Sequence, residues 1–159
     1  MEIGIIGLGL IGGSLAKAIS QNTDNTVYGY DISDQVVKKA VLVNAIEQPL
    51  TDSLLPQCDI VIVALYPKAA IEYVQAHADL IRPGAIVVDC CGVKKIVCDA
   101  LIPLAEEKGF LFVGGHPMAG LEHSGFTYAK KSLLNNASMI FTTTKGPIES
   151  ISRLKDLFT

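Results

Sequence analysis

A histidine between residues that restrict the backbone is the strongest candidate for chemistry in this sequence. His116 follows two glycines and precedes Pro117. Glycine lets the chain approach a ligand closely and proline fixes φ, so we expect the imidazole to be held in place beside a cleft. Histidine titrates near neutral pH, which suits a general base. His77 is expected in a solvated or capping position and His123 in an irregular segment, and neither makes a metal-binding spacing with His116.

Three glycines at a GxGxxG spacing indicate a phosphate-binding turn. They follow an apolar segment typical of a strand and precede apolar residues at helical spacing. Gly7 allows a tight turn, Gly9 lets the backbone approach a pyrophosphate, and Gly12 lets the helix pack close to the strands. The helix N-terminus would offer free N–H groups to the phosphates. The expected cofactor contacts in this turn are Gly7, Leu8, Gly9, Leu10, Ile11 and Gly12.

An acidic residue at the end of the next predicted strand completes the dinucleotide fingerprint. Asp31 can accept hydrogen bonds from the hydroxyls of the adenosine ribose. A 2′-phosphate would face this carboxylate, and residues 32–34 supply no lysine or arginine to offset the repulsion. The sequence therefore favours NAD over NADP. No second flavin-binding segment is found, which disfavours a flavin.

Alternating strands and helices must position these residues. The expected strands are 2–6, 27–30, 45–47, 59–65, 85–89, 110–113 and 138–143. Helices are expected from about residue 11, after Ser33, from Pro67, from about Val93 with a kink or restart at Pro103, and from Pro147. This alternation predicts one α/β domain over residues 1–159, a doubly wound Rossmann-type fold with a mostly parallel sheet.

The carboxyl ends of parallel strands bind ligands in such folds. The segment after residues 59–65 is expected beside the pyrophosphate or adenosine, and the segment after residues 85–89 near the nicotinamide. Lys94 could attract an anionic substrate there, or be a solvated helix lysine. The expected cofactor contacts at these two ends are Ala64, Leu65, Tyr66, Cys91 and Gly92.

The composition excludes several classes of protein. The 159 residues are 50% hydrophobic and 18% charged, which is incompatible with a disordered chain. A net charge of −3 and a pI of about 5.5 argue against a nucleic-acid partner. Four cysteines without metal-ligand spacing indicate reduced core thiols. No uncharged apolar stretch is long enough for a membrane span, and we expect a cytoplasmic protein.

Three segments together resemble the prephenate dehydrogenase family. They are residues 7–14 (GLGLIGGS), the loop with Asp89, Val93 and Lys94, and residues 116–120 (HPMAG) followed by Ser124 and Gly125. The resemblance covers essentially the whole chain in order. It implies NAD-dependent oxidative decarboxylation of prephenate to 4-hydroxyphenylpyruvate in tyrosine biosynthesis. His116 then matches the histidine that accepts the proton of the ring hydroxyl, and Lys94 and Ser124 lie on the substrate side.

Two residues and one domain depart from the family pattern. Gly92 stands where many members have a serine that orients the histidine and the substrate hydroxyl, and Leu121 stands where polar residues are frequent. The family's second, helical domain, which supplies an arginine for the substrate carboxylate and most of a dimer contact, is absent from this chain. We expect the chain to bind NAD with little activity, and the full-length protein to be a homodimer.

Other functions remain open at this point. An arogenate dehydrogenase would act on the amino-acid form of the same ring. A 3-hydroxyacid or imine reductase would share the fold but leave His116-Pro117 unexplained. A sensor module that binds NAD without catalysis would tolerate replacement of His116.

Overall fold

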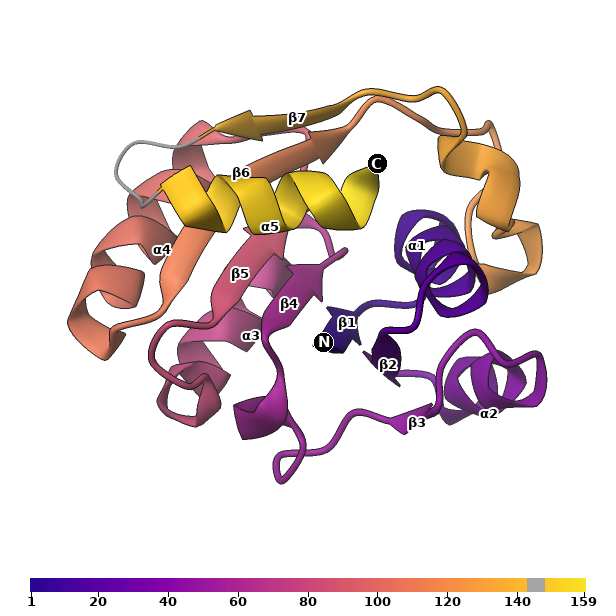
Figure 1. Cartoon of the computed structure of the whole chain (residues 1–159), viewed down its shortest axis with the longest axis horizontal. Helices are drawn as coiled ribbons and strands as arrows, with labels where there is room; N and C mark the ends of the chain where they lie inside the picture. The colour runs from indigo at the N-terminus through magenta and orange to yellow at the C-terminus, as the bar shows by residue number, and fades with distance from the viewer. Residues whose placement is uncertain (143–147) are drawn as a thin grey trace.

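A central sheet carries the fold in the computed structural model, which describes residues 1–142 and 148–159. Its strand order is β3-β2-β1-β4-β5-β6-β7 (Figure 1), with parallel pairs from β3 to β6 and an antiparallel pair between β6 and β7. The strands are β1 (Glu2–Ile6), β2 (Thr26–Tyr30), β3 (Gln48–Pro49), β4 (Ile60–Val63), β5 (Ile86–Asp89), β6 (Leu111–Pro117) and β7 (Met139–Thr142). The expected doubly wound, mostly parallel sheet is confirmed.

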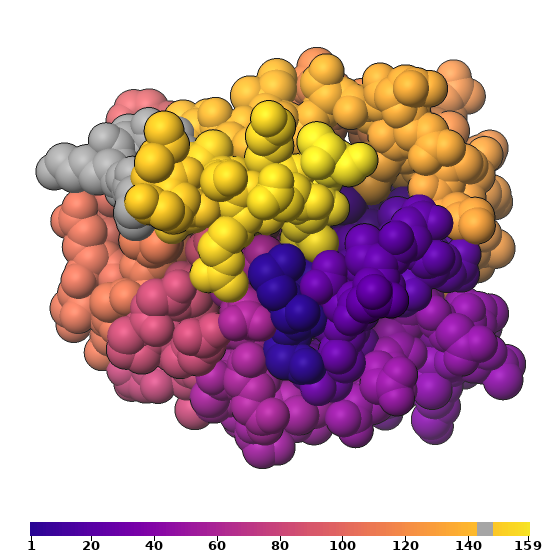
Figure 2. Space-filling model, viewed as in Figure 1, coloured from indigo at the N-terminus to yellow at the C-terminus, as the bar shows by residue number. Residues whose placement is uncertain are grey.

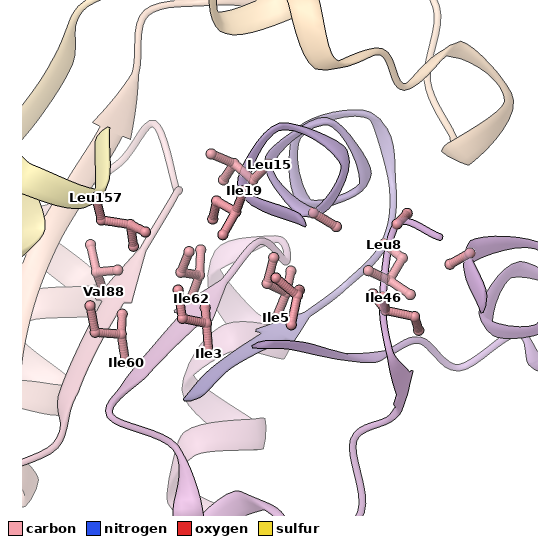
Figure 3. Packing of buried hydrophobic residues seen from close by; sticks show 14 of the residues in the cluster. Ile3, Ile5, Leu8, Leu15, Ile19, Ile46, Ile60, Ile62, Val88 and Leu157 are labelled. Atoms are coloured by element: carbon pink, nitrogen blue, oxygen red, sulfur yellow. The ribbon is translucent and has the colours of Figure 1, made fainter. Parts of the chain in front are cut away.

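Helices cover both faces of the sheet. The face with α1 (Leu10–Asn22), α2 (Asp34–Leu42) and α5 (Ile148–Phe158) packs on one set of strand residues, and α3 (Pro67–His77) and α4 (Lys95–Lys108) pack on the alternate set. Every residue of β4 is buried because both of its faces are covered, which explains its uninterrupted apolar sequence. Figure 3 shows the first core, where Ile3, Ile5 and Ile62 lie beneath Leu15 and Ile19 of α1.

Local signals in the sequence set several helix boundaries. Pro67 is the first residue of α3, where its missing N–H costs no hydrogen bond. Gly109 ends α4 in the left-handed conformation, with φ of 83°. Of the expected kink or restart at Pro103, the restart is wrong, since α4 continues from Lys95 to Lys108 through the proline. The kink stays a prediction. Buried residues on one side of α4, such as Val97 and Leu101, hold the helix against the sheet on either side of this point.

The third strand lies further along the chain than expected. The strand predicted at 45–47 is found at Gln48–Pro49, paired with Tyr28 and Gly29 of β2. The N–H groups of Ala45 and Ile46 instead bond to the carbonyl of Ala40 and close the end of α2. Figure 3 shows the Ile46 side chain in the core beside Leu8. Ala45 and Ile46 therefore close the end of α2 and pack in the core, and they do not form a strand.

Strand β6 is longer than expected. It was predicted to end at Val113, but it continues to Pro117 because β7 pairs with it in antiparallel register, His116 opposite Ile140. Thr143 and Pro147, the predicted end of the last strand and start of the last helix, lie outside the described residues.

The α5 helix lies across the face of the molecule seen in Figure 2, beside the N-terminal residues and α1. Its Leu154 is fully buried, and Arg153 lies 3.7 Å from Asp59, just before β4. Within residues 1–142 and 148–159, no helix has the length and apolar character needed to cross a membrane.

Candidate active site

The glycine turn between β1 and α1 has two kinds of glycine. A Cβ on Gly12 would lie 1.8 Å from the Gly7 carbonyl oxygen, and one on Gly7, whose φ is +87°, would lie 2.5 Å from the Ala64 carbonyl oxygen. These two glycines are required by the fold itself. A Cβ on Gly9 would meet no described atom within 4 Å. Gly9 therefore leaves space in front of α1 without being needed for packing.

The N-terminus of α1 is suited to an anion. The helix begins at Leu10 after Gly9, and within the described part of the chain no side chain caps it. Its first N–H groups have no partner inside the helix, and its first turn contains no acidic residue. Free donors at the positive end of a helix dipole favour a phosphate. The expected cofactor contacts at residues 7–12 stay a prediction.

Asp31 is held beside this turn. Its Oδ2 accepts the Leu8 N–H at 2.9 Å, and its Oδ1 accepts the Ser33 N–H at 2.9 Å. Each carboxylate oxygen keeps a further lone pair for a hydroxyl donor. The carboxylate is thus oriented toward the mouth of the turn before any ligand binds.

A cavity of about 390 Å³ adjoins Asp31, between the end of β2 and α2. Asp34 and Lys38 of α2 are among its lining residues. Sequence reasoning missed Lys38 because only residues 32–34 were considered as partners of a 2′-phosphate. Helical spacing could have found it, since residues 34 and 38 share one face of α2.

The carboxyl ends of β4 and β5 lie side by side, and the residues that follow β4 contact the glycine turn. The Cys91 thiol donates to the Leu65 carbonyl oxygen at 3.3 Å, which joins the two loops. Burial raises the pKa of this thiol to about 12, so it is a neutral hydrogen-bond donor. Tyr66, the residue before α3, is 85% exposed at this edge, as a ring that contacts a ligand would be. The structure therefore brings the predicted residues of both strand ends to one edge.

A buried ion pair links β5 to β6. The carboxylate of Asp89, fully buried at the end of β5, pairs with the Lys94 ammonium. It also accepts the N–H groups of Cys91 and Gly115, each at 3.0 Å. Lys94 Nζ donates in addition to the Gly115 carbonyl oxygen at 2.5 Å. Sequence reasoning placed Asp89 and Lys94 in one loop motif but did not foresee that the two side chains pair.

His116 lies within β6, not in a loop after it as expected. The imidazole is half-buried, and a Cβ built on Gly92 would lie 3.7 Å from its Nε2 atom. Gly92 itself is exposed, so the space beside this nitrogen opens to solvent. The histidine therefore lies at the edge where the ends of β5 and β6 meet.

The remaining histidines and Ser124 lie elsewhere. His77 ends α3, stacks on Tyr73 and lies 2.8 Å from the Tyr73 carbonyl oxygen through Nδ1, which agrees with the expected capping position. His123 stacks on Tyr128, with ring centroids 4.6 Å apart. Ser124 is exposed in the same segment, whose following residues pack on α1. Its predicted substrate contact remains a prediction.

The four cysteines are free thiols. Cys58 and Cys91 are buried, as expected for core thiols, whereas Cys90 and Cys98 are half-buried. Burial raises the pKa of the Cys58 thiol to about 12, which makes a nucleophilic role unfavourable. Over the described ranges, no group of three metal-ligating side chains comes together.

Together, the sheet order, the glycine turn and Asp31 define a dinucleotide-binding Rossmann domain. The family described as "Prephenate dehydrogenase, nucleotide-binding domain" matches residues 15–159. The chain is 33% identical to the prephenate dehydrogenase of Bacillus subtilis strain 168, over 96% of this chain and 42% of that protein. It belongs to the prephenate dehydrogenase family, as its nucleotide-binding domain.

Solved structures agree with this assignment. The arogenate dehydrogenase of Synechocystis superposes with a TM-score of 0.91 at 28% identity, covering 99% of this chain and 55% of that one. The prephenate dehydrogenase of A. aeolicus, solved with hydroxyphenyl propionate and NAD+, gives a TM-score of 0.87 at 29% identity, covering 99% and 56%. The chain thus spans about half the length of the relatives it matches.

Proposed function

We propose that this chain is the NAD-binding and proton-accepting half of a dehydrogenase that oxidatively decarboxylates prephenate or its amino-acid counterpart, arogenate. The observation that carries the proposal is the position of His116, whose Nε2 faces open space beside Gly92 at the meeting point of β5 and β6. The A. aeolicus prephenate dehydrogenase was solved in complex with hydroxyphenyl propionate and NAD+, which supports this pairing of ligands.

The residues on the cofactor side fit NAD. The uncapped N-terminus of α1 and the space left by Gly9 suit the pyrophosphate, and Asp31 suits the ribose hydroxyls. When bound, NAD+ supplies a hydride acceptor. Tyr66 would offer an exposed ring to the adenosine or pyrophosphate, and Cys91 and Gly92 would lie on the nicotinamide side.

On the substrate side, His116 acts as the base. Its Nε2 accepts the proton of the ring C4 hydroxyl while the C4 hydrogen leaves with its electron pair, so that the C4–O bond becomes a carbonyl. Loss of the ring carboxylate as carbon dioxide then makes the ring aromatic. Proton removal in the same step avoids a cationic carbonyl, which is the benefit of a positioned base.

Both substrates fit this chemistry because the reacting ring is the same in each. The named relatives include a prephenate dehydrogenase and an arogenate dehydrogenase. The groups that read the side chain and its carboxylate are expected in the helical domain of the full-length protein, which we propose to be a homodimer. This chain alone is then expected to bind NAD without turning over.

Steady-state kinetics of the full-length protein test the proposal. The assay uses prephenate and arogenate, each with NAD+ and NADP+, and follows reduced nicotinamide. NAD-dependent oxidation of at least one ring acid is the expected result. Absence of oxidation of both would contradict the proposal, and a clear preference for one assigns the substrate.

A further inference from the structure

The segment that carries His116 is held by side chains where main-chain pairing with β5 has ended. The register between β5 and β6 stops at Val88 opposite Val113. Two residues later, the Gly115 N–H bonds to Asp89 Oδ1 and the Gly115 carbonyl accepts from Lys94 Nζ. The Asp89–Lys94 pair therefore continues the attachment of β6 to β5 up to the residue before His116.

Position 115 has room for glycine alone. A Cβ there would lie 2.3 Å from the Asp89 carbonyl oxygen and 2.8 Å from the Val88 side chain. The close approach of the two backbones brings Gly115 within reach of both members of the ion pair. The position of His116 relative to β5 is thus set by contacts to the preceding residue, Gly115.

The same pair holds the loop on the other side of the imidazole. Asp89 Oδ2 accepts the Cys91 N–H, and Gly92 follows directly, with its built Cβ 3.7 Å from His116 Nε2. Lys94 ends this loop before α4 begins. The Asp89 carboxylate and the Lys94 ammonium thus connect β6, which carries His116, to the loop 91–92 beside its imidazole.

We propose that Asp89 and Lys94 are positioning residues that set the distance between His116 and the loop 91–92, and that Lys94 does not serve as the anion-binding group for substrate. This inference rests on the proposed function. A buried carboxylate is stable only with its donors in place, so the pair favours one arrangement of the two segments. The Lys94 side chain is only 21% exposed, and its ammonium is already engaged by Asp89 and Gly115.

The test compares Lys94→Met with Lys95→Met. Lys95 is the next residue, its side chain is 87% exposed, and it pairs with Asp99 on the surface of α4, which makes it a matched control. In the full-length protein, Lys94→Met is expected to lower kcat by about 10²-fold with little change in the KM for the ring acid, because misplacement of a base acts on the chemical step. Lys95→Met is expected to change neither constant.

A local measurement separates this proposal from the proposed function. Hydrogen exchange of the Gly115 N–H is expected to speed up in Lys94→Met and to stay unchanged in Lys95→Met, whether or not the protein oxidises a ring acid. If Lys94→Met does not fold, Lys94→Gln retains hydrogen-bonding capacity toward Asp89 and Gly115 without the charge, and a smaller loss of kcat at constant KM is expected.

Two outcomes overturn the proposal. A raised KM with unchanged kcat in the Lys94 variant would make the lysine a substrate-binding group, and unchanged exchange of Gly115 would show that the pair does not hold the strand. If the wild-type protein oxidises neither ring acid, the proposed function fails and the catalytic part of this inference fails with it. The Gly115 exchange would then still report on the ion pair.

Discussion

The Asp31 carboxylate links the glycine turn to the expected ribose site, and its replacement tests the choice of cofactor. Asp31→Ala removes the acceptor for the ribose hydroxyls and the bond to the Leu8 N–H. Hydrogen bonds to a charged group contribute about 1.5–3 kcal/mol, so NAD+ binding to this chain should weaken by roughly ten-fold or more. Calorimetry measures the affinity, with Asp24→Ala as control, because Asp24 is an exposed carboxylate that does not line the cavity beside Asp31. Equal or tighter binding of NADP+ by the wild-type chain would contradict the assignment and direct attention to Lys38.

In the proposed mechanism, His116 is the residue on which the chemical step depends. His116→Asn should lower kcat of the full-length protein by about 10²–10⁴-fold, the usual contribution of a positioned base. The affinity for NAD+ should change little, because the phosphates bind at the distant turn. Near-normal kcat would mean that the base lies elsewhere, and His123→Asn would be the next variant.

The space beside His116 offers a gain-of-function test. Gly92→Ser would place a Cβ 3.7 Å from Nε2, and the attached hydroxyl can then reach hydrogen-bond distance. A net hydrogen bond of about 0.5–1.5 kcal/mol corresponds to roughly a two- to ten-fold rise in kcat if it orients the imidazole. Gly92→Ala adds the Cβ alone and should not raise kcat. A fall with serine but not alanine would show that the hydroxyl misdirects the ring.

In the turn between β1 and α1, Gly7 and Gly12 are needed for backbone packing, whereas Gly9 is expected to matter for NAD+ binding. Gly12→Ala forces a Cβ to 1.8 Å from a backbone oxygen, so the turn must shift, at a cost of about 1–3 kcal/mol in the free energy of unfolding. Gly9→Ala meets no described atom and should leave stability nearly unchanged, yet weaken NAD+ binding. Denaturant unfolding and calorimetry on both variants give the comparison. Equal stability losses would contradict this division of roles.

At the scale of the whole molecule, apolar side chains are exposed on the surface near the candidate active site. Val93 and Ile96 at the start of α4 and Met118 after β6 are each more than half exposed. Apolar side chains left exposed in this way do not exclude water from a reacting ring. Residues 1–159 saturated with NAD+ should therefore form no measurable NADH with prephenate, whereas calorimetry should still detect NAD+ binding. Robust turnover by this chain would show that the whole substrate site lies within it.

Much of the molecule is readable from local sequence. The apolar run of β4, the proline that opens α3 and the glycine spacing before α1 each act over a few residues, so strand, helix and turn follow from neighbours in the chain. The short third strand shows the limit. Ala45 and Ile46, the apolar residues predicted to form it, close the end of α2 and pack in the core instead. The exposed residues Gln48 and Pro49 pair with β2.

What the sequence determined by itself is the class of fold, the phosphate-binding turn, Asp31 and the candidate base. The tertiary structure decided how that base is held. His116 is part of β6 because β7, more than twenty residues later, pairs with it, and Lys94 and Asp89 each bond directly to the Gly115 backbone across a similar separation. Such contacts leave no periodic signal, because they depend on which strands become neighbours and on burial that makes one carboxylate require one particular cation.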